Sequence, residues 1–249
     1  MMVVVEKEFD LKEIELYEKS KSQTSKEFNL NPVNNIYLIL NKLSKRLNND
    51  AAYVECGTFR GNTLLTAANF LKSKNIDKKL FGIDTFEGFP AKEHYYKDLP
   101  SYFEVLLNSK KITQDHYEKA KIRTNGFQEI LHLENEYFSD TNSIFDKAEK
   151  FNNIKLLVGK FEDVTPNFSE RIEVLHLDGD LYHSYITCLE NLYGKVIAGG
   201  SIIFDEYYSL KYPGARVAVD EFLQDKKGIM EMYRTPEGFE RWCFVKEDE

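Results

Sequence analysis

Short apolar runs recur along the chain, and each is followed by acidic or glycine residues. Five such runs lie at residues 51–54, 79–83, 153–158, 174–177 and 201–204. Runs of this length without strict alternation are typical of strands buried on both faces of a parallel sheet. Segments with helical character that can serve as crossovers lie at residues 63–72, 185–196 and 215–224. Two final apolar segments, 229–233 and 241–245, are joined by Pro236-Glu237-Gly238 and predict a hairpin. The pattern therefore predicts a doubly wound α/β sheet of seven strands, one of them antiparallel.

The chain outside these runs is more polar. Residues 1–30 are charged, with a poorly defined amphipathic helix, and we expect an N-terminal arm that covers the site or makes homo-oligomer contacts. A helix at 32–47 precedes the first strand, and 197–200 form a turn before the fifth. Residues 91–151 exceed what a crossover needs and are rich in aromatic side chains. We interpret them as a helical lid or acceptor-binding insertion, or as a satellite core under a helical cap.

Composition narrows the class of protein. Of the 249 residues, 42% are hydrophobic and 30% are charged, as in ordinary globular proteins, and we expect one domain over residues 1–249. The net charge of −8 disfavours a nucleic-acid partner. No apolar run approaches the roughly twenty residues of a membrane span, and the N-terminus turns acidic at Glu6, unlike a signal peptide. Three distant cysteines, Cys56, Cys188 and Cys243, disfavour a disulfide framework, so we expect a reducing cytoplasm.

The strongest chemical signal lies where two strands end. The fourth apolar run is followed by Asp178-Gly179-Asp180, and the fifth by Asp205-Glu206. If these strands are neighbours, the four carboxylates converge at the carboxyl edge of the sheet and repel one another unless a cation or a proton lies between them. A hard divalent ion is the simplest explanation. The alternative for each single residue is an N-cap role at the helix that follows.

A second signal lies at the ends of the first two strands. Glu55, Gly57 and Gly61 follow the first strand, with a spacing that differs from the G-x-G-x-x-G dinucleotide fingerprint. Here a carboxylate can meet a ligand ammonium, while backbone N–H groups at the helix start, Asn62-Thr63, meet a ligand carboxylate. Asp84 ends the second strand 27 positions after Gly57, where doubly wound folds bind ribose hydroxyls. A ligand with an amino-acid end and a nucleoside is indicated, and S-adenosylmethionine is the common cofactor of that kind.

Five motifs give the chain a resemblance to a known family. They are Val54-Glu-Cys-Gly-Thr-Phe-Arg-Gly61, Gly82-Ile-Asp-Thr-Phe-Glu-Gly-Phe-Pro90, Val158-Gly-Lys-Phe-Glu-Asp-Val-Thr-Pro166, Leu175-His-Leu-Asp-Gly-Asp-Leu-Tyr182 and Gly199-Gly-Ser-Ile-Ile-Phe-Asp-Glu-Tyr207. In order and content they resemble the macrocin O-methyltransferase (TylF/MycF-type) family, over roughly residues 33 to 245. The resemblance implies a Rossmann-like methyltransferase sheet and a methyl transfer to a sugar hydroxyl that depends on S-adenosylmethionine and Mg²⁺.

The resemblance also implies roles for individual acidic residues. Asp178 matches the first metal-binding aspartate, Asp180 the catalytic base, and Asp205 with Glu206 the second and third metal ligands. The usual pair at the last two positions is Asp-Asp, so Glu206 is a departure that puts the third ligand in doubt.

The loop after the third strand completes the expected cofactor site. In this fold it runs along the adenine, so we expect Phe161 to pack on the ring and Glu162 or Asp163 to accept from the exocyclic amine. The expected cofactor-binding residues are Glu55, Gly57, Thr58, Arg60, Gly61, Asp84, Thr85, Phe161, Glu162 and Asp178.

A sugar hydroxyl is a poor nucleophile, so the hypothesis pairs a metal ion that lowers its pKa with Asp180 as the acceptor of its proton. The expected acceptor is a sugar, free in a glycosylated natural product or activated as a nucleotide sugar for a surface polysaccharide. Three alternatives stay open: a methyltransferase for a catechol-like diol, a glycosyltransferase that uses Asp178-Gly179-Asp180 as a D-x-D motif, and a non-catalytic binding protein. The glycosyltransferase leaves Glu55 and Asp84 unexplained. The sequence assigns no role to His94, His116 and His132.

Overall fold

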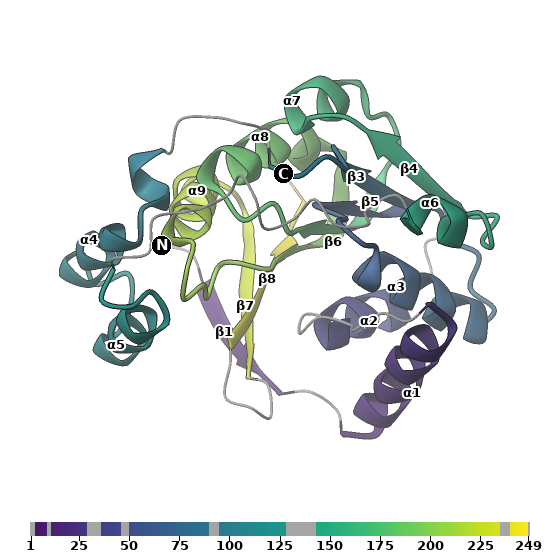
Figure 1. Cartoon of the computed structure of the whole chain (residues 1–249), viewed down its shortest axis with the longest axis horizontal. Coiled ribbons are helices and arrows are strands. Elements are labelled where there is room, and N and C mark those ends of the chain that lie inside the picture. The colour runs from purple at the N-terminus through teal and green to yellow at the C-terminus, as the bar shows by residue number, and fades with distance from the viewer. Residues whose placement is uncertain are drawn as a thin grey trace.

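The protein is described by a computed structural model that places residues 3–8, 11–28, 36–45, 50–89, 95–127, 143–234 and 240–248. One mixed sheet of eight strands runs through this part of the chain, in the order β1-β7-β8-β6-β5-β2-β3-β4 (Figure 1). The strands are β1 (Val3–Lys7), β2 (Ala52–Cys56), β3 (Leu80–Asp84), β4 (Ile154–Val158), β5 (Ile172–Leu177), β6 (Val196–Phe204), β7 (Gly228–Arg234) and β8 (Glu240–Lys246). Strand β8 is antiparallel to both of its neighbours, and the other pairs are parallel.

Helices cover both faces of the sheet, with α1, α2, α3 and α6 on one face and α7, α8 and α9 on the other (Figure 1). The α-helices are α1 (Leu11–Phe28), α2 (Ile36–Lys45), α3 (Asn62–Ser73), α4 (Phe103–Asn108), α5 (Gln114–Arg123), α6 (Ser143–Ala148), α7 (Phe161–Val164), α8 (Tyr182–Leu192) and α9 (Pro213–Leu223). Short 3-10 helices are η1 (Tyr96–Asp98), η2 (Pro100–Tyr102), η3 (Thr165–Asn167) and η4 (Tyr193–Lys195).

The predicted fold class is confirmed, and all seven predicted strands are present. The eighth strand, β1, comes from the segment that we expected to form only an arm, and it pairs in parallel with β7. Its three consecutive valines favour a strand, but a run this short at a chain end gives no hint of its partner. The expected turn at 197–200 is wrong, because these residues lie inside β6. The register accommodates them: Ile172 pairs with Val196, but Val174 pairs with Ser201.

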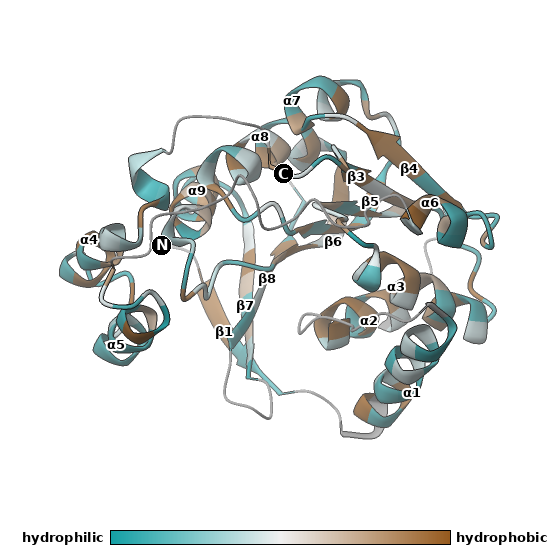
Figure 2. Cartoon of the chain, viewed as in Figure 1, coloured by the Kyte–Doolittle hydropathy of each residue, from teal (hydrophilic) through white to brown (hydrophobic). Residues whose placement is uncertain are grey.

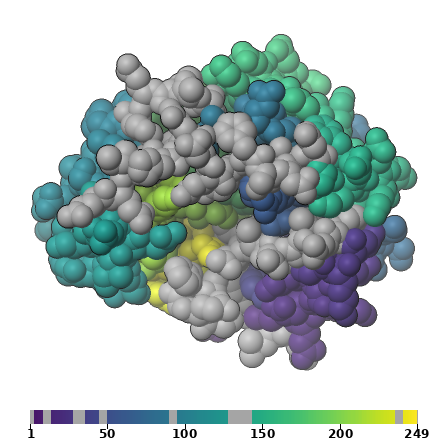
Figure 3. Space-filling view, viewed as in Figure 1, coloured from purple at the N-terminus to yellow at the C-terminus, as the bar shows by residue number. Residues whose placement is uncertain are grey.

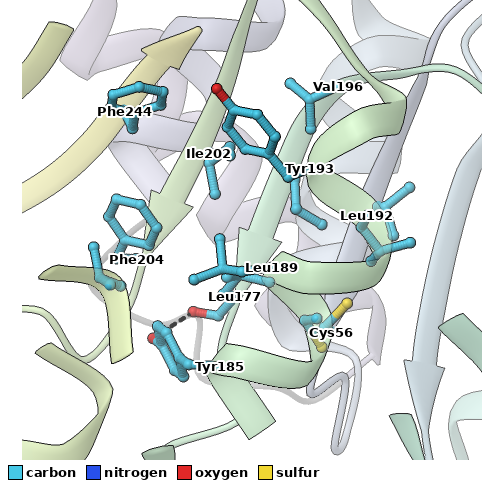
Figure 4. Close-up of a cluster of buried hydrophobic side chains, with 14 of the residues drawn as sticks. Cys56, Leu177, Tyr185, Leu189, Leu192, Tyr193, Val196, Ile202, Phe204 and Phe244 are labelled. Atoms are coloured by element: carbon cyan, nitrogen blue, oxygen red, sulfur yellow. Dashed lines mark hydrogen bonds between the residues drawn. The ribbon is translucent and has the colours of Figure 1, made fainter. Parts of the chain in front are cut away.

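Two buried clusters flank the sheet, and Figure 2 shows the apolar sides of the helices turned toward the strands. Figure 4 shows the cluster under α8 and α9, in which Leu177 of β5 packs with Tyr185 and Leu189 of α8. The cluster on the other face joins Tyr53 and Val174 to α2 and α3. Helix α1 is more polar than α2 or α3 along its length, in keeping with its outer position (Figures 1 and 2).

The segment predicted as an insertion places α4 and α5 beside α9, far from α1 (Figures 1 and 3). Phe103 and Tyr117 pack there with Val217 of α9 in a small apolar cluster, which supports the satellite-core interpretation for these two rings. A lid role for residues 91–151 stays a prediction. So do the single domain over residues 1–249 and an arm at residues 1–30 that covers the site or makes homo-oligomer contacts. His94 and His132, to which the sequence assigned no role, lie outside the described residues. Within the described part of the chain, no helix combines the length and apolar character needed to cross a membrane.

Candidate functional site

The carboxyl ends of four parallel strands are level with one another. Cys56 of β2 pairs with Leu177 of β5, which pairs in turn with Phe204 of β6, while Ile83 of β3 pairs with Cys56 on the other side. The two strands that carry the acidic tips are therefore neighbours, as the sequence analysis required. The residues that follow these positions meet at one edge of the sheet: Gly57, Asp84, Asp178 and Asp205.

Backbone hydrogen bonds continue past the strand ends and fix the tips. The N–H of Asp178 donates to the end of β2 at 2.8 Å, and the N–H of Asp205 donates to the carbonyl of Leu177 at 3.0 Å. The buried hydroxyl of Tyr185 donates to the same carbonyl at 2.7 Å (Figure 4) and accepts from the N–H of Glu206 at 3.0 Å. Helix α8 thus ties both acidic tips together through a single side chain.

Two glycines allow the close approach of these loops. Gly57 has φ +94°, and a Cβ at this position would lie 2.0 Å from the carbonyl oxygen of Asp178. Gly179, between the two aspartates that follow β5, would place a Cβ 2.8 Å from Ser184 and 3.0 Å from the ring of Phe161. Only glycine fits at Gly57 without displacement of the β5 tip.

A pocket of about 330 Å³ opens over this edge. Seven predicted residues line it: Gly57, Asp84, Thr85, Phe161, Asp178, Asp180 and Asp205. Seven further residues line it without a role predicted from the sequence: Phe59, Gly88, Phe89, Gly159, Lys160, Gly179 and Ser184. All but Ser184 lie inside the family-like motifs, so their positions in those motifs were the available signal.

Asp84 is held by the loops on either side of it. Its carboxylate accepts from the N–H of Phe59 at 2.8 Å and from the N–H of Phe86 at 2.9 Å. Each carboxylate oxygen has a second lone pair, so further acceptance from a ligand hydroxyl is compatible with these bonds. The neighbouring Thr85 hydroxyl donates to the carbonyl of Gly88 at 2.8 Å, which shapes the same wall of the pocket.

Six predicted residues do not belong to the pocket lining: Glu55, Thr58, Arg60, Gly61, Glu162 and Glu206. Glu55 is 1% exposed and accepts from the hydroxyl of Tyr53 at 2.6 Å, behind the pocket wall. Gly61 is the N-cap of α3, and its φ of +76° explains a glycine there. The direct cofactor contacts assigned to the first five residues, and the metal contact assigned to Glu206, stay predictions.

A histidine with no predicted role, His176, lies among the acidic tips. One ligand atom from each of His176, Asp178 and Asp205 lies within 4.8 Å of the other two. His176 is fully buried, with Nδ1 3.7 Å from the carboxylate of Glu55 and Nε2 3.7 Å from Asp205 Oδ1. Burial alone would lower the pKa of His176, but the surrounding carboxylates outweigh it and raise the pKa to about 10. The strand alternation that turns His176 toward Asp178 gave the only sequence signal.

The acidic tips have strongly perturbed protonation. Burial and then the charge of Asp205 raise the pKa of Asp178 well above its ordinary value, and the same two causes raise the pKa of Glu206. For Asp180 they raise the pKa to about 7, against the opposing charge of Lys211. Asp180 also has φ +59°, which is uncommon for a residue other than glycine and is found preferentially at functional sites. A cation between these groups would relieve their repulsion.

The insertion is anchored beside Asp180. The carboxylate of Asp98 accepts from the N–H of Tyr182 at 2.8 Å, at the first turn of α8, and burial raises the pKa of Asp98 to about 6. Lys97 bonds to Glu221 of α9 at 2.6 Å and lies 4.5 Å from the centroid of the Tyr182 ring. The ring of Tyr95 lies 4.6 Å from that of Tyr182, so aromatic surface adjoins the acidic tips.

Among the three histidines without a predicted role, the structure describes His116. It is buried, and its Nε2 lies 2.6 Å from the carbonyl oxygen of Ser209. Its ring packs 4.3 Å from that of Tyr208, and burial lowers its pKa to about 4. This environment is that of a neutral structural histidine that links α5 to the loop before α9.

Comparisons with known proteins agree with this geometry. The chain is 27% identical to mycinamicin III 3''-O-methyltransferase of Micromonospora griseorubida over 71% of the chain and 61% of the relative. It is 27% identical to 8-demethyl-8-(2,3-dimethoxy-alpha-L-rhamnosyl)-tetracenomycin-C 4'-O-methyltransferase of Streptomyces olivaceus over 62% of the chain and 52% of the relative. The chain therefore spans little more than half of the length of these relatives. The structure of the O-methyltransferase NovP shares the fold, with a TM-score of 0.54, 22% identity, and coverage of 86% of this chain and 78% of NovP.

The family assignment rests on a longer match. The model of the macrocin-O-methyltransferase (TylF) family matches residues 40–235, well over half of the chain. The match contains the four level strand ends, the pocket and both acidic tips, which are the features that the resemblance implied. The chain belongs to the macrocin O-methyltransferase (TylF) family.

Proposed function

We propose that the protein transfers a methyl group from S-adenosylmethionine to a hydroxyl of a sugar, with a divalent ion at the acidic tips of β5 and β6. One observation carries this proposal: a single pocket is lined by the tips of β2 and β3 and by the aspartates that follow β5 and β6. Groups suited to the cofactor and groups suited to acid–base and metal chemistry therefore share one volume.

The pocket residues suit S-adenosylmethionine. The pocket has a volume of about 330 Å³, at the lower end of the range for small-molecule sites, roughly 300 to 1,000 Å³. Asp84 offers carboxylate oxygens for ribose hydroxyls, and Phe161 offers an aromatic face for the adenine. When bound, S-adenosylmethionine would supply an activated methyl group, and a divalent ion would lower the pKa of the acceptor hydroxyl.

Asp180 has the properties of the base. It lines the pocket beside Asp178 and Asp205, and burial raises its pKa above that of an ordinary aspartate, which makes its carboxylate a better proton acceptor. Asp178 and Asp205 line the same wall and offer the oxygen ligands that hard divalent ions prefer.

The acceptor that we propose is a sugar, in a glycosylated natural product or activated as a nucleotide sugar. The tetracenomycin relative is named for a rhamnosyl compound, and both relatives are O-methyltransferases by name. The ring of Tyr95 is 37% exposed and lies beside that of Tyr182, which follows the base by two residues. Tyr96 is 57% exposed and packs against Tyr95. Aromatic faces of this kind suit the apolar face of a sugar ring. A cytoplasmic location, homo-oligomerisation and the absence of a nucleic-acid partner remain part of the proposal.

The first test is calorimetric titration of S-adenosylmethionine and S-adenosylhomocysteine into the wild-type protein, Asp84→Ala and the control Asp77→Ala. Asp77 is exposed and lies in the loop before β3. We expect Asp84→Ala to weaken binding about 10- to 100-fold, since hydrogen bonds to a charged group contribute about 1.5 to 3 kcal/mol, and Asp77→Ala to leave it unchanged. Failure of both compounds to bind, with magnesium present or chelated, would refute the methyltransferase assignment.

The second test is a methyl-transfer screen of nucleotide sugars, glycosides and catechols with wild-type protein and Asp180→Asn. We expect transfer to a sugar, with kcat reduced at least about 100-fold in Asp180→Asn because the base is lost. Affinity for S-adenosylhomocysteine should stay within twofold of the wild type. Transfer to catechols alone would replace the sugar by a diol acceptor.

A further inference from the structure

We propose that the ion at the acidic tips is a first-row divalent transition metal, such as Mn²⁺, held by His176, Asp178 and Asp205, and that Glu206 lies outside this ligand set. The inference rests on the proposed function only in taking these carboxylates as the metal site. It replaces the Mg²⁺ that the family resemblance implies by an ion with a nitrogen ligand.

The geometry of the three side chains carries the first step. Their ligand atoms lie within 4.8 Å of one another, and His176 Nε2 is 3.7 Å from Asp205 Oδ1. An ion with bonds of about 2.0 to 2.2 Å joins two atoms that are up to about 4.4 Å apart, so the His176–Asp205 pair fits as it stands, and a pair at the 4.8 Å limit would have to close by about 0.4 Å. At 3.7 Å the nitrogen and oxygen are too far apart for a hydrogen bond but close enough to share one ion.

The second step is an unsatisfied atom. His176 is 0% exposed, and its Nε2 makes no hydrogen bond of ordinary length within the described part of the chain, although it faces Asp205 at an ion-pair distance of 3.7 Å. A buried polar atom without a hydrogen bond is rare and calls for an explanation such as an ion that displaces its proton. Here the atom faces Asp205, whose carboxylate lines the pocket, so an ion can reach it from the pocket side.

The other side of the imidazole supports the same role. Nδ1 lies 3.7 Å from the carboxylate of Glu55 and 3.5 Å from the hydroxyl of Tyr53. The Tyr53 hydroxyl in turn bonds to Glu55 at 2.6 Å. A carboxylate behind a histidine fixes the ring orientation and raises the basicity of the nitrogen that binds the metal. Glu55 therefore orients His176, which gives this buried acid a function away from the pocket wall.

Glu206 borders this group without belonging to it. It follows Asp205 directly, its N–H donates to Tyr185, and its carboxylate is hydrogen-bonded to both Ser209 and Asp205. Among the described residues, the group within 4.8 Å contains His176 and does not include Glu206. The departure from the family's usual Asp-Asp pair is then accommodated, because His176 supplies the third side-chain ligand.

The ligand set determines the preference among ions. Mg²⁺ favours oxygen ligands and retains much of its water, whereas an imidazole ligand increases affinity for first-row transition ions in the Irving–Williams order. Two carboxylates with one imidazole should therefore bind Mn²⁺ at least about tenfold more tightly than Mg²⁺.

The test measures Mn²⁺ and Mg²⁺ affinity by calorimetry and the Mn²⁺ ligands by pulsed electron paramagnetic resonance, without any methyl-transfer assay. For the wild type we expect one Mn²⁺ per chain with a ¹⁴N coupling typical of bound imidazole. His176→Gln should lose the coupling and weaken Mn²⁺ binding at least tenfold, and Glu55→Gln should weaken it about tenfold. His183→Gln, at an exposed histidine of α8, and Glu206→Gln should retain the wild-type signal.

Several outcomes would overturn the inference. Mn²⁺ bound without ¹⁴N coupling, unchanged affinity in His176→Gln, or loss of the ion in Glu206→Gln would assign the site to carboxylates alone. No bound Mn²⁺ would leave His176 as a charged bridge between Glu55 and Asp205. The wild-type spectrum decides the question even where His176→Gln does not fold, and circular dichroism identifies that case. Binding of S-adenosylhomocysteine, measured on the same samples, shows separately whether the proposed function holds.

Discussion

Substitution of Gly57 by alanine should be among the most damaging small changes in the protein. The φ of +94° puts the residue in a region that L-residues avoid, at a cost of about 1 to 2 kcal/mol. In addition, the new Cβ would lie 2.0 Å from the carbonyl oxygen of Asp178, which has to retreat by about 1.4 Å to reach an ordinary contact of 3.4 Å. That movement strains the hydrogen bond from the Asp178 N–H to β2, which contributes about 1 kcal/mol. We expect a total loss of about 3 kcal/mol or more in the free energy of unfolding.

Urea unfolding of Gly57→Ala and Gly126→Ala separates the two causes. Gly126 also has positive φ, at +71°, but a Cβ there meets nothing within 4 Å among the described residues, so only the conformational cost of about 1 to 2 kcal/mol applies. Because Asp178 lines the pocket, Gly57→Ala should also weaken binding of S-adenosylhomocysteine, whereas Gly126→Ala should not. If both variants lose the same stability, the close approach of Gly57 to the β5 tip is not a determinant of the fold.

Three further predictions concern stability. Burial lowers the pKa of His116 from 6.5 in the unfolded chain to about 4 in the folded protein. Below pH 6.5 the unfolded chain therefore binds a proton that the folded protein does not, and stability falls as the pH is lowered from 6.5 toward 4. Urea unfolding should show that the free energy of unfolding falls by up to about 3 kcal/mol over this pH window. The loss should be smaller in His116→Gln and unchanged in His183→Gln; the same pH dependence in His116→Gln as in the wild type would contradict this prediction. Tyr185→Phe removes the hydroxyl that joins the two acidic tips and should cost about 1 to 2 kcal/mol, measured in the same way; a neutral effect would show that the tips are held without it. Lys78→Met leaves Glu173 buried and unpaired and should cost about 3 to 5 kcal/mol, whereas Lys78→Met with Glu173→Leu should recover most of it; no recovery would argue against the ion pair as the cause.

The sequence alone was sufficient for seven of the eight described strands and for the placement of acidic residues at the ends of β5 and β6. Apolar runs that end in Asp178-Gly179-Asp180 and in Asp205-Glu206 are local signals, because burial on both faces of a parallel strand leaves an uninterrupted run. The expectation that the two tips meet followed from the rule that parallel strands align their carboxyl ends, and β5 and β6 are indeed neighbours. The family motifs contributed the likeness to a methyltransferase.

Tertiary structure decided the features that depend on register and on distant partners. Strand β1 pairs with β7, and Val3 lies opposite Ile229, so no local pattern could specify that contact. Glu55 and His176 lie opposite each other on β2 and β5, and strand alternation turns both side chains to the same face. Their environment, with Asp205 of a third strand beside His176, exists only once three strands are in register, because a shift of one residue would turn each side chain to the other face of the sheet.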